Sequence, residues 1–177
     1  DEFVKKFVTA VENLKIWDPM EASTQIGPLA KSSAVEGIHK QVTDTIKEGW
    51  VLLTWWEKVE GIGCFYKPTV LEVKPWMTTF EEETFGPVAS IIKARDFEEA
   101  VILANDSKYW LWASVFSNDE NELNYAISNI ETWNIAINSV VTSYANLPYG
   151  WIKDSWFGKE LWEKWVKAFV NEKVVIY

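Results

Sequence analysis

Residues 147–162 read LPYGWIKDSWFGKELW, and this stretch gives the strongest indication of the fold. Tryptophan stands at Trp151, Trp156 and Trp162, among small, polar and turn-forming residues that favour glycine instead. The chain has twelve tryptophans among 177 residues, and all of them stand where glycine would be expected. The pattern of the whole chain is therefore best understood with glycine in mind at these positions.

Other tryptophans lie at sites whose local chemistry also favours glycine. Trp133 follows a helical run over residues 121–132, and a left-handed glycine commonly ends a helix there. Trp76 follows a proline, and Trp55 and Trp56 lie between two strand-like runs, so the sequence predicts turns at both sites. A bulky side chain is strained in such turns, because positive φ is easy only for glycine.

With glycine in place of tryptophan, residues 147–162 become LPYGGIKDSGFGKELG. This string resembles a C-terminal signature of the aldehyde dehydrogenase family, P-F-G-G-x-K-x-S-G-x-G-x-E. The resemblance extends in order over nearly all 177 residues. Further similar segments are residues 108–115 (KYGLGASV after replacement), 131–138 (ETGNIAIN after replacement), 13–19 (NLKIWDP), 24–29 (TQIGPL), 65–71 (FYKPTVL) and 81–88 (EEETFGPV).

The run TSYANLP from Thr142 is most similar to the succinate-semialdehyde dehydrogenase branch of that family. Some bacterial lineages read the UGA codon as glycine, and translating that codon as tryptophan would produce the observed pattern. We therefore predict that the tryptophan positions are glycines in the natural protein. The alternative is a non-catalytic, Trp-rich binding module of the carbohydrate-binding type, and a third possibility is a standalone chain with a regulatory or remnant role.

Composition sets broad limits on function. The chain is 48% hydrophobic and 24% charged, which is typical of a globular protein with a real core. A net charge of −9 argues against nucleic-acid binding through a basic patch, and no apolar run is long enough for a membrane span. One histidine and one cysteine exclude a Cys/His zinc cluster and an internal disulfide. We expect a cytoplasmic protein without a metal.

Helix-like and strand-like segments alternate along the chain. This order predicts an α/β fold with a mostly parallel sheet flanked by helices, and the resemblance implies an aldehyde dehydrogenase-like catalytic domain. The sequence predicts helices at residues 1–13, 28–48, 97–105, 119–130 and 159–170, and strands at 51–54, 65–73, 88–94, 113–116, 134–138 and 173–177.

The resemblance implies oxidation of an aldehyde to a carboxylate with NAD or NADP as cofactor. In the family a cysteine thiolate attacks the carbonyl, hydride leaves to the cofactor, and a glutamate-activated water hydrolyses the thioester. The family's nucleophile lies just upstream of a segment similar to residues 1–4, so we expect nucleophile and base outside this chain, which would be inactive alone. Cys64 lies in a context unlike the catalytic cysteine, GCFY, and is interpreted as a small structural residue.

Two residues of the EEETFGPV segment are candidate cofactor contacts. The resemblance implies that Glu83 accepts hydrogen bonds from the hydroxyls of the nicotinamide ribose, a role that suits a two-oxygen acceptor. It also implies that Phe85 packs near the nicotinamide. Glu81 and Glu82 are interpreted as solvated surface residues.

Tyr149 replaces the phenylalanine of the family signature, which lines the aldehyde tunnel. We expect Tyr149 to line a substrate tunnel whose outer wall is residues 139–147; the alternative is an ordinary loop beside a core aromatic. Residues 170–177 resemble the strand by which family members join a neighbouring subunit's sheet. We therefore expect a catalytic portion at residues 1–169, an oligomerisation strand at residues 170–177, a small aldehyde as substrate and a homo-oligomer.

Overall fold

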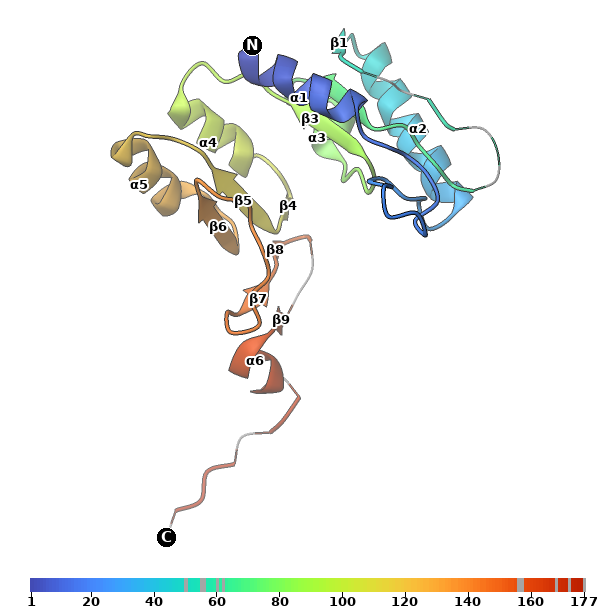
Figure 1. Cartoon of the computed structure of the whole chain (residues 1–177). Helices are drawn as coiled ribbons and strands as arrows, with labels where there is room; N and C mark the ends of the chain where they lie inside the picture. Colours follow the sequence, from blue (N-terminus) through green and yellow to red (C-terminus); the bar gives the residue numbers. More distant parts are fainter. Residues whose placement is uncertain are drawn as a thin grey trace. The chain divides into compact units, whose positions relative to one another are not determined.

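The computed structural model describes residues 1–49, 51–54, 57–59, 61, 63–155, 158–167, 169–171 and 173–176. The chain divides into two compact units (Figure 1), which we name unit 1 (Asp1–Lys93) and unit 2 (Ala94–Tyr177). Helices and strands alternate in both units, so the α/β class predicted from the sequence is confirmed.

Unit 1 contains a three-stranded sheet of order β1-β2-β3 with helices beside it. The β2 and β3 strands pair in parallel from Thr69↔Val88 to Glu72↔Ile91, whereas β1 is antiparallel to β2. The elements are α1 (Glu2–Glu12), α2 (Ser32–Lys47), β1 (Val51–Leu52), β2 (Thr69–Glu72), α3 (Thr78–Glu81) and β3 (Val88–Ile91).

The core of unit 1 lies between α2 and β2. Val35, Ile38 and Val42 recur at helical spacing on one face of α2 and are buried. They form one cluster with Leu71 of β2 and with Tyr66, Val73 and Met77. Burial of each large apolar side chain stabilises the fold by roughly 1.5–3 kcal/mol, so this cluster fixes how α2 lies against the sheet.

Turn residues of unit 1 follow the sequence predictions closely. Gly49, at φ +104°, follows the C-cap of α2, as the sequence predicts for the end of that helix. Trp76 lies in a turn with φ +74°, which confirms the predicted turn and is a rare conformation for so large a side chain. The predicted turn at Trp55 and Trp56 falls outside the described residues.

Unit 2 has three two-stranded sheets and two main helices. The β5 and β6 strands pair in parallel, while the short pairs β4-β8 and β7-β9 are antiparallel. The elements are α4 (Phe97–Asn105), β4 (Tyr109–Trp110), β5 (Trp112–Val115), α5 (Glu120–Asn129), β6 (Asn134–Ile137), β7 (Tyr149–Gly150), β8 (Ile152–Lys153), β9 (Lys159–Glu160) and α6 (Trp162–Lys167).

Helices α4 and α5 of unit 2 each begin with a carboxylate cap. Asp96 accepts a hydrogen bond from Glu99 N at 2.8 Å, and Asp119 accepts one from Asn121 N at 2.7 Å. Each cap satisfies a backbone N–H group that has no partner within the helix. The structure therefore confirms the helix starts that the acidic residues predict.

Two secondary-structure predictions for unit 2 are wrong. Residues 159–160 form β9 rather than the start of a helix, because they pair with β7 in the register Tyr149↔Glu160. Trp133 is not a left-handed helix cap, since α5 already ends at Asn129 and its C-cap Ile130 has φ −76°. Residues 173–176 form no strand with the described part of their own chain, and their predicted pairing with another subunit stays a prediction.

Within the described ranges, no helix is both long and apolar enough to cross a bilayer.

Candidate cofactor and substrate sites

The segment between α3 and β3 carries Glu83 and Phe85 in unit 1. It is short, and both of its ends are fixed: α3 precedes it, and Thr69 N of β2 donates to Pro87 O at 2.8 Å where it enters β3. Gly86 lies so close to α2 that a Cβ atom there would meet Ile38 Cδ1 at 2.1 Å. A side chain at Gly86 would therefore have to displace the end of the buried Ile38 side chain.

Helix α2 also holds this segment by hydrogen bonds from one face. Gln41 Nε2 donates to Glu82 Oε2 at 3.0 Å and to Glu83 O at 3.2 Å. Four residues along, buried Thr45 Oγ1 accepts from Thr79 N at 3.1 Å. One turn further, Glu48 accepts from the amide and the hydroxyl of Thr78 at 3.0 and 2.8 Å.

The two predicted cofactor residues project from this fixed segment. The Glu83 carboxylate is exposed and, among the described residues, makes no hydrogen bond or ion pair. Phe85 is 81% exposed, which is unusual for a phenylalanine on a well-anchored segment. An unpaired carboxylate two residues from an uncovered aromatic ring fits a ligand that has vicinal hydroxyls and a flat ring, as a nicotinamide riboside does.

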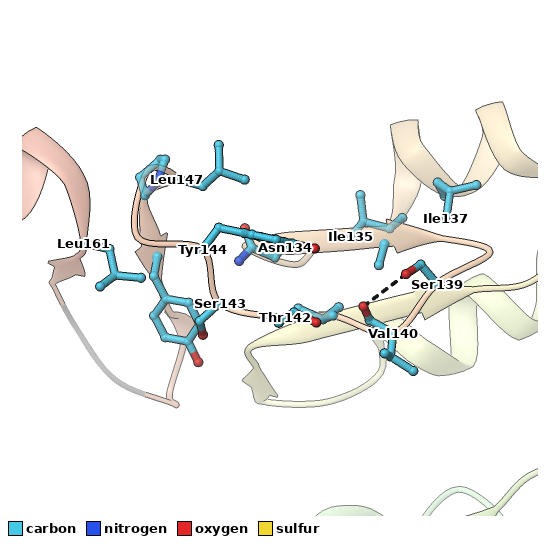
Figure 2. Close-up of a pocket in the computed structure, with 14 residues that line it drawn as sticks. Asn134, Ile135, Ile137, Ser139, Val140, Thr142, Ser143, Tyr144, Leu147 and Leu161 are labelled. Carbon is cyan, nitrogen blue, oxygen red and sulfur yellow. Dashed lines mark hydrogen bonds between the residues drawn. The ribbon is translucent and has the colours of Figure 1, made fainter.

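The predicted substrate residues meet at one cavity in unit 2. The cavity has a volume of about 220 Å³ and lies between β6 and the loop that follows it (Figure 2). Leu161 reaches it from the segment between β9 and α6. Its lining residues are Asn134, Ile135, Ala136, Ile137, Ser139, Val140, Val141, Thr142, Ser143, Tyr144, Leu147, Pro148, Tyr149 and Leu161.

Tyr149 lies on the wall of this cavity and within an aromatic group. Its ring meets the rings of Trp112 and Trp151 edge to face, with centroid separations of 5.7 and 5.2 Å. Partial burial raises the pKa of Tyr149, a hydrogen bond with Trp112 opposes the shift, and the charge of Glu160 adds to it. The hydroxyl of Tyr149 therefore stays protonated at neutral pH.

Side-chain clamps hold the loop of residues 139–147 at both ends. At its start Asn138, with φ +51°, accepts from Ser117 N at 3.0 Å and donates to Ser117 O at 2.9 Å. Beyond its end Lys153 donates to Asn105 O at 2.7 Å and Ser107 O at 3.0 Å, and pairs with Glu131 at 3.0 Å. The Asn138 bonds join the ends of β5 and β6, and the Lys153 contacts join β8 to the ends of α4 and α5.

Cys64 and His39 lie against the core of unit 1 rather than at either site. Cys64 is half-buried and packs on the core cluster, and its carbonyl accepts from Leu29 N at 2.7 Å. Nδ1 of His39 lies 3.4 Å from the Tyr66 hydroxyl. Both environments support the structural interpretation made from the sequence.

Sequence reasoning missed Gln41, Asn138 and Lys153 as residues that build these sites. A signal for Gln41 does exist, because Gln41 and Thr45 are polar residues at the spacing of the apolar face of α2. Asn138 and Lys153 carry no comparable local signal, since their partners lie 21 or more residues away.

Comparison with known proteins identifies relatives along the whole chain. The Aldehyde dehydrogenase family model matches residues 1–175. The NADP(+) succinate-semialdehyde dehydrogenase of Mycobacterium avium is 39% identical over 176 residues, which are 99% of this chain and 37% of that protein. The NAD(P)+ succinate semialdehyde dehydrogenase of Escherichia coli K12 is 40% identical over 174 residues, 98% of this chain and 38% of that protein.

Solved structures agree with these sequence relatives. The succinic semialdehyde dehydrogenase of Streptococcus pyogenes, in complex with NADP+, matches with a TM-score of 0.92 at 32% identity, covering 100% of this chain and 39% of that one. A lactaldehyde dehydrogenase matches with a TM-score of 0.94 at 28% identity, covering 99% and 37%. The chain thus spans less than two fifths of the length of these relatives. Since the family model covers almost every residue, the chain belongs to the aldehyde dehydrogenase family.

Proposed function

We propose that this chain is part of the catalytic domain of an NAD(P)-dependent aldehyde dehydrogenase that oxidises succinate semialdehyde to succinate. The observation that carries the proposal is 36–40% identity, over nearly the whole chain, to relatives that are all succinate-semialdehyde dehydrogenases. In the overall reaction the aldehyde carbon takes oxygen from water and loses hydride to the oxidised nicotinamide, with release of protons. When bound, the nicotinamide supplies the hydride acceptor.

In this proposal the residues of unit 1 hold the nicotinamide end of the cofactor. Glu83 accepts hydrogen bonds from the ribose hydroxyls, and Phe85 limits where the nicotinamide ring can lie. The exposure of both side chains and the free Glu83 carboxylate support these roles. The thiol nucleophile and the general base belong to parts of the enzyme other than this chain, because Cys64, its only cysteine, is half-buried against the core of unit 1.

The residues of unit 2 form part of the aldehyde tunnel in the same proposal. Tyr149 and the loop of residues 139–147 line one cavity, which supports the placement predicted from the sequence. The lining combines apolar side chains with several hydroxyl groups, which suits a short, partly polar aldehyde. No tryptophan lines the cavity among the described residues, but two of its lining residues contact tryptophans: Tyr149 meets the rings of Trp112 and Trp151, and Pro148 O accepts from Trp133 Nε1 at 3.3 Å.

We propose further that the tryptophan positions are glycines encoded by UGA. Trp76 supports this because its φ of +74° suits glycine and its side chain is 66% exposed. Trp17, Trp112 and Trp165 are exposed as well, although indoles are usually well covered. Codons at the twelve positions decide the matter, and UGG codons there would refute the proposal. The peptide masses of protein from the native host give an independent answer.

We also propose that the C-terminal segment is an oligomerisation strand of the full-length enzyme. Val174 is 84% exposed and Ile176 is 90% exposed, and an apolar β-branched run left bare at a chain end favours pairing with another subunit. Deletion of residues 174–177 from the full-length enzyme should lower its oligomeric mass in sedimentation. An unchanged number of subunits per particle would exclude this role.

The catalytic proposal is tested with the full-length enzyme carrying the residues its gene specifies. We expect it to reduce NAD or NADP when succinate semialdehyde is added, and to turn over shorter aldehydes that lack the carboxylate less well. The isolated chain should show no turnover under the same conditions. Activity of the isolated chain that disappears in Cys64→Ala would place the nucleophile here and overturn the proposal.

A further inference from the structure

Two adjacent carboxylates, Glu82 and Glu83, lie on one exposed segment of unit 1. Both have the chemistry needed to accept hydrogen bonds from a diol, so sequence chemistry alone does not separate them. The structure does separate them, because the Glu82 carboxylate already accepts a hydrogen bond from Gln41 at 3.0 Å. Among the described residues the Glu83 carboxylate accepts none.

Gln41 contacts both residues through a single amide nitrogen. Its Nε2 atom carries two hydrogens, which allows one bond to Glu82 Oε2 and a second, at 3.2 Å, to Glu83 O. The first bond turns the Glu82 side chain toward α2, and the second fixes the backbone at Glu83. The carboxylate of Glu83 is exposed and, among the described residues, accepts no hydrogen bond from the helix.

Helix α2, which carries Gln41, is itself held in place by several contacts. Gln41, Thr45 and Glu48 are spaced so that they lie on one face of α2. Thr45 is fully buried and bonds Thr79, while Glu48 holds the first residue of α3. The position of Gln41 relative to the segment is therefore set by contacts that do not depend on Gln41 itself.

We propose that Gln41 is the positioning residue that presents Glu83, rather than Glu82, to the nicotinamide ribose. The proposal rests on the proposed function of Glu83 as a cofactor ligand. Gln41 touches neither cofactor nor substrate, and acts only by orienting its two partners. Its removal should therefore weaken cofactor binding and leave aldehyde binding unchanged.

The test uses the full-length enzyme with Gln41→Leu, which keeps the size of the side chain but removes the donor. Calorimetric titration with NAD and NADP in the absence of aldehyde should show roughly threefold to tenfold weaker binding. Hydrogen exchange without cofactor should become faster at the amides of residues 82–86. The KM for aldehyde and the melting temperature should change little. Ser33→Ala, an exposed position on α2 with no side-chain hydrogen bond among the described residues, should change none of these quantities.

A double variant distinguishes the proposed role of Gln41 from the proposed role of Glu83 as a cofactor ligand. If Gln41 acts through Glu83, then Gln41→Leu combined with Glu83→Gln should bind cofactor no more weakly than Glu83→Gln alone. Gln41→Glu, which also lacks the donor hydrogens, repeats the test if the leucine variant does not fold. The proposed role of Gln41 would be wrong if the double variant lost cofactor affinity by the product of the two single losses, or if Gln41→Leu bound cofactor as tightly as the wild type. Neither result would affect the proposed role of Glu83. Wild-type binding by Glu83→Gln would instead show that the cofactor assignment is wrong and remove the basis of both.

Discussion

The two units of this chain are stabilised in different ways. Unit 1 has a continuous apolar cluster around α2 and β2, in which Val42 and Leu71 are inaccessible to solvent. In unit 2 the apolar side chains that are buried among the described residues are Val101 and Ala126, both on helices. The segment between α3 and β3 of unit 1 thus lies against a packed apolar core. The loop of residues 139–147 in unit 2 is held largely by hydrogen bonds and an ion pair of polar side chains.

The proposed function explains this difference in packing between the two units. A cofactor contact must be held in one place in every turnover, and dense packing provides that rigidity. A substrate wall tolerates variation, because loops held by a few side-chain bonds can change without disturbing a core.

The largest expected effect is on the stability of unit 1. Leu71→Ala in the full-length enzyme should lower the free energy of unfolding by about 2–5 kcal/mol, because it leaves a cavity in the packed cluster. Ile102→Ala on α4 of unit 2 is the matched control, since Ile102 is mainly exposed, and should cost about 0.5 kcal/mol or less. Urea unfolding measures both, and equal losses would contradict the distinction between the units.

Glu83→Gln should weaken cofactor binding or slow the hydride step roughly tenfold to a hundredfold, because hydrogen bonds to a charged group are worth about 1.5–3 kcal/mol. Unfolding of the enzyme without cofactor should hardly change, since Glu83 makes no side-chain contact among the described residues. Glu81→Gln, on the same exposed stretch, is the control and should have almost no effect. Identical kinetics for all three proteins would refute the cofactor role.

Lys153→Met tests the polar clamps of unit 2. Loss of the bonds to two carbonyls and one carboxylate should lower stability by about 1–2 kcal/mol, since Lys153 is only partly shielded from water. Hydrogen exchange should rise at the ends of α4 and α5 and leave unit 1 unchanged. A uniform rise over the whole chain would show that the clamp is not local.

The smallest effect concerns alkaline pH. Burial raises the pKa of Tyr66 to about 12, against an opposing hydrogen bond with Thr69. The folded protein therefore keeps this proton after the unfolded chain has lost it, so stability falls as the pH rises from about 10 to about 12. Tyr66→Phe should flatten this decline by up to about 1.4 kcal/mol per pH unit. Parallel stability curves for the two proteins would show that Tyr66 does not contribute.

Local signals predicted much of the fold correctly. The caps at Asp96 and Asp119 and the stop at Gly49 depend on neighbouring residues, and the structure confirms all three. The short strands β7, β8 and β9 were not predicted, because two-residue strands exist only through partners elsewhere in the chain. The helix predicted at residues 159–170 begins too early for the same reason, since residues 159–160 pair with β7 and α6 begins at Trp162.

The residues of the candidate sites show the same difference between local signals and long-range contacts. Glu83, Phe85 and Tyr149 were predicted as site residues through motif resemblance. Gln41 lies 41 residues before Glu82, and only the folded α2 brings the two together. Residues that position others are harder to find from sequence because their identity follows from geometry rather than from the chemistry of the reaction.

Gly86 couples substitutions in the segment between α3 and β3 to substitutions in the core of unit 1. An alanine at this position would press its methyl group onto Ile38 Cδ1, an atom that a valine at position 38 would not have. Ile38→Val and Gly86→Ala should therefore be better tolerated together than their separate effects imply. Substitutions in the apolar core of unit 1 thus change which substitutions are tolerated in the segment between α3 and β3. A library that varies this segment alone would sample only part of the tolerated combinations.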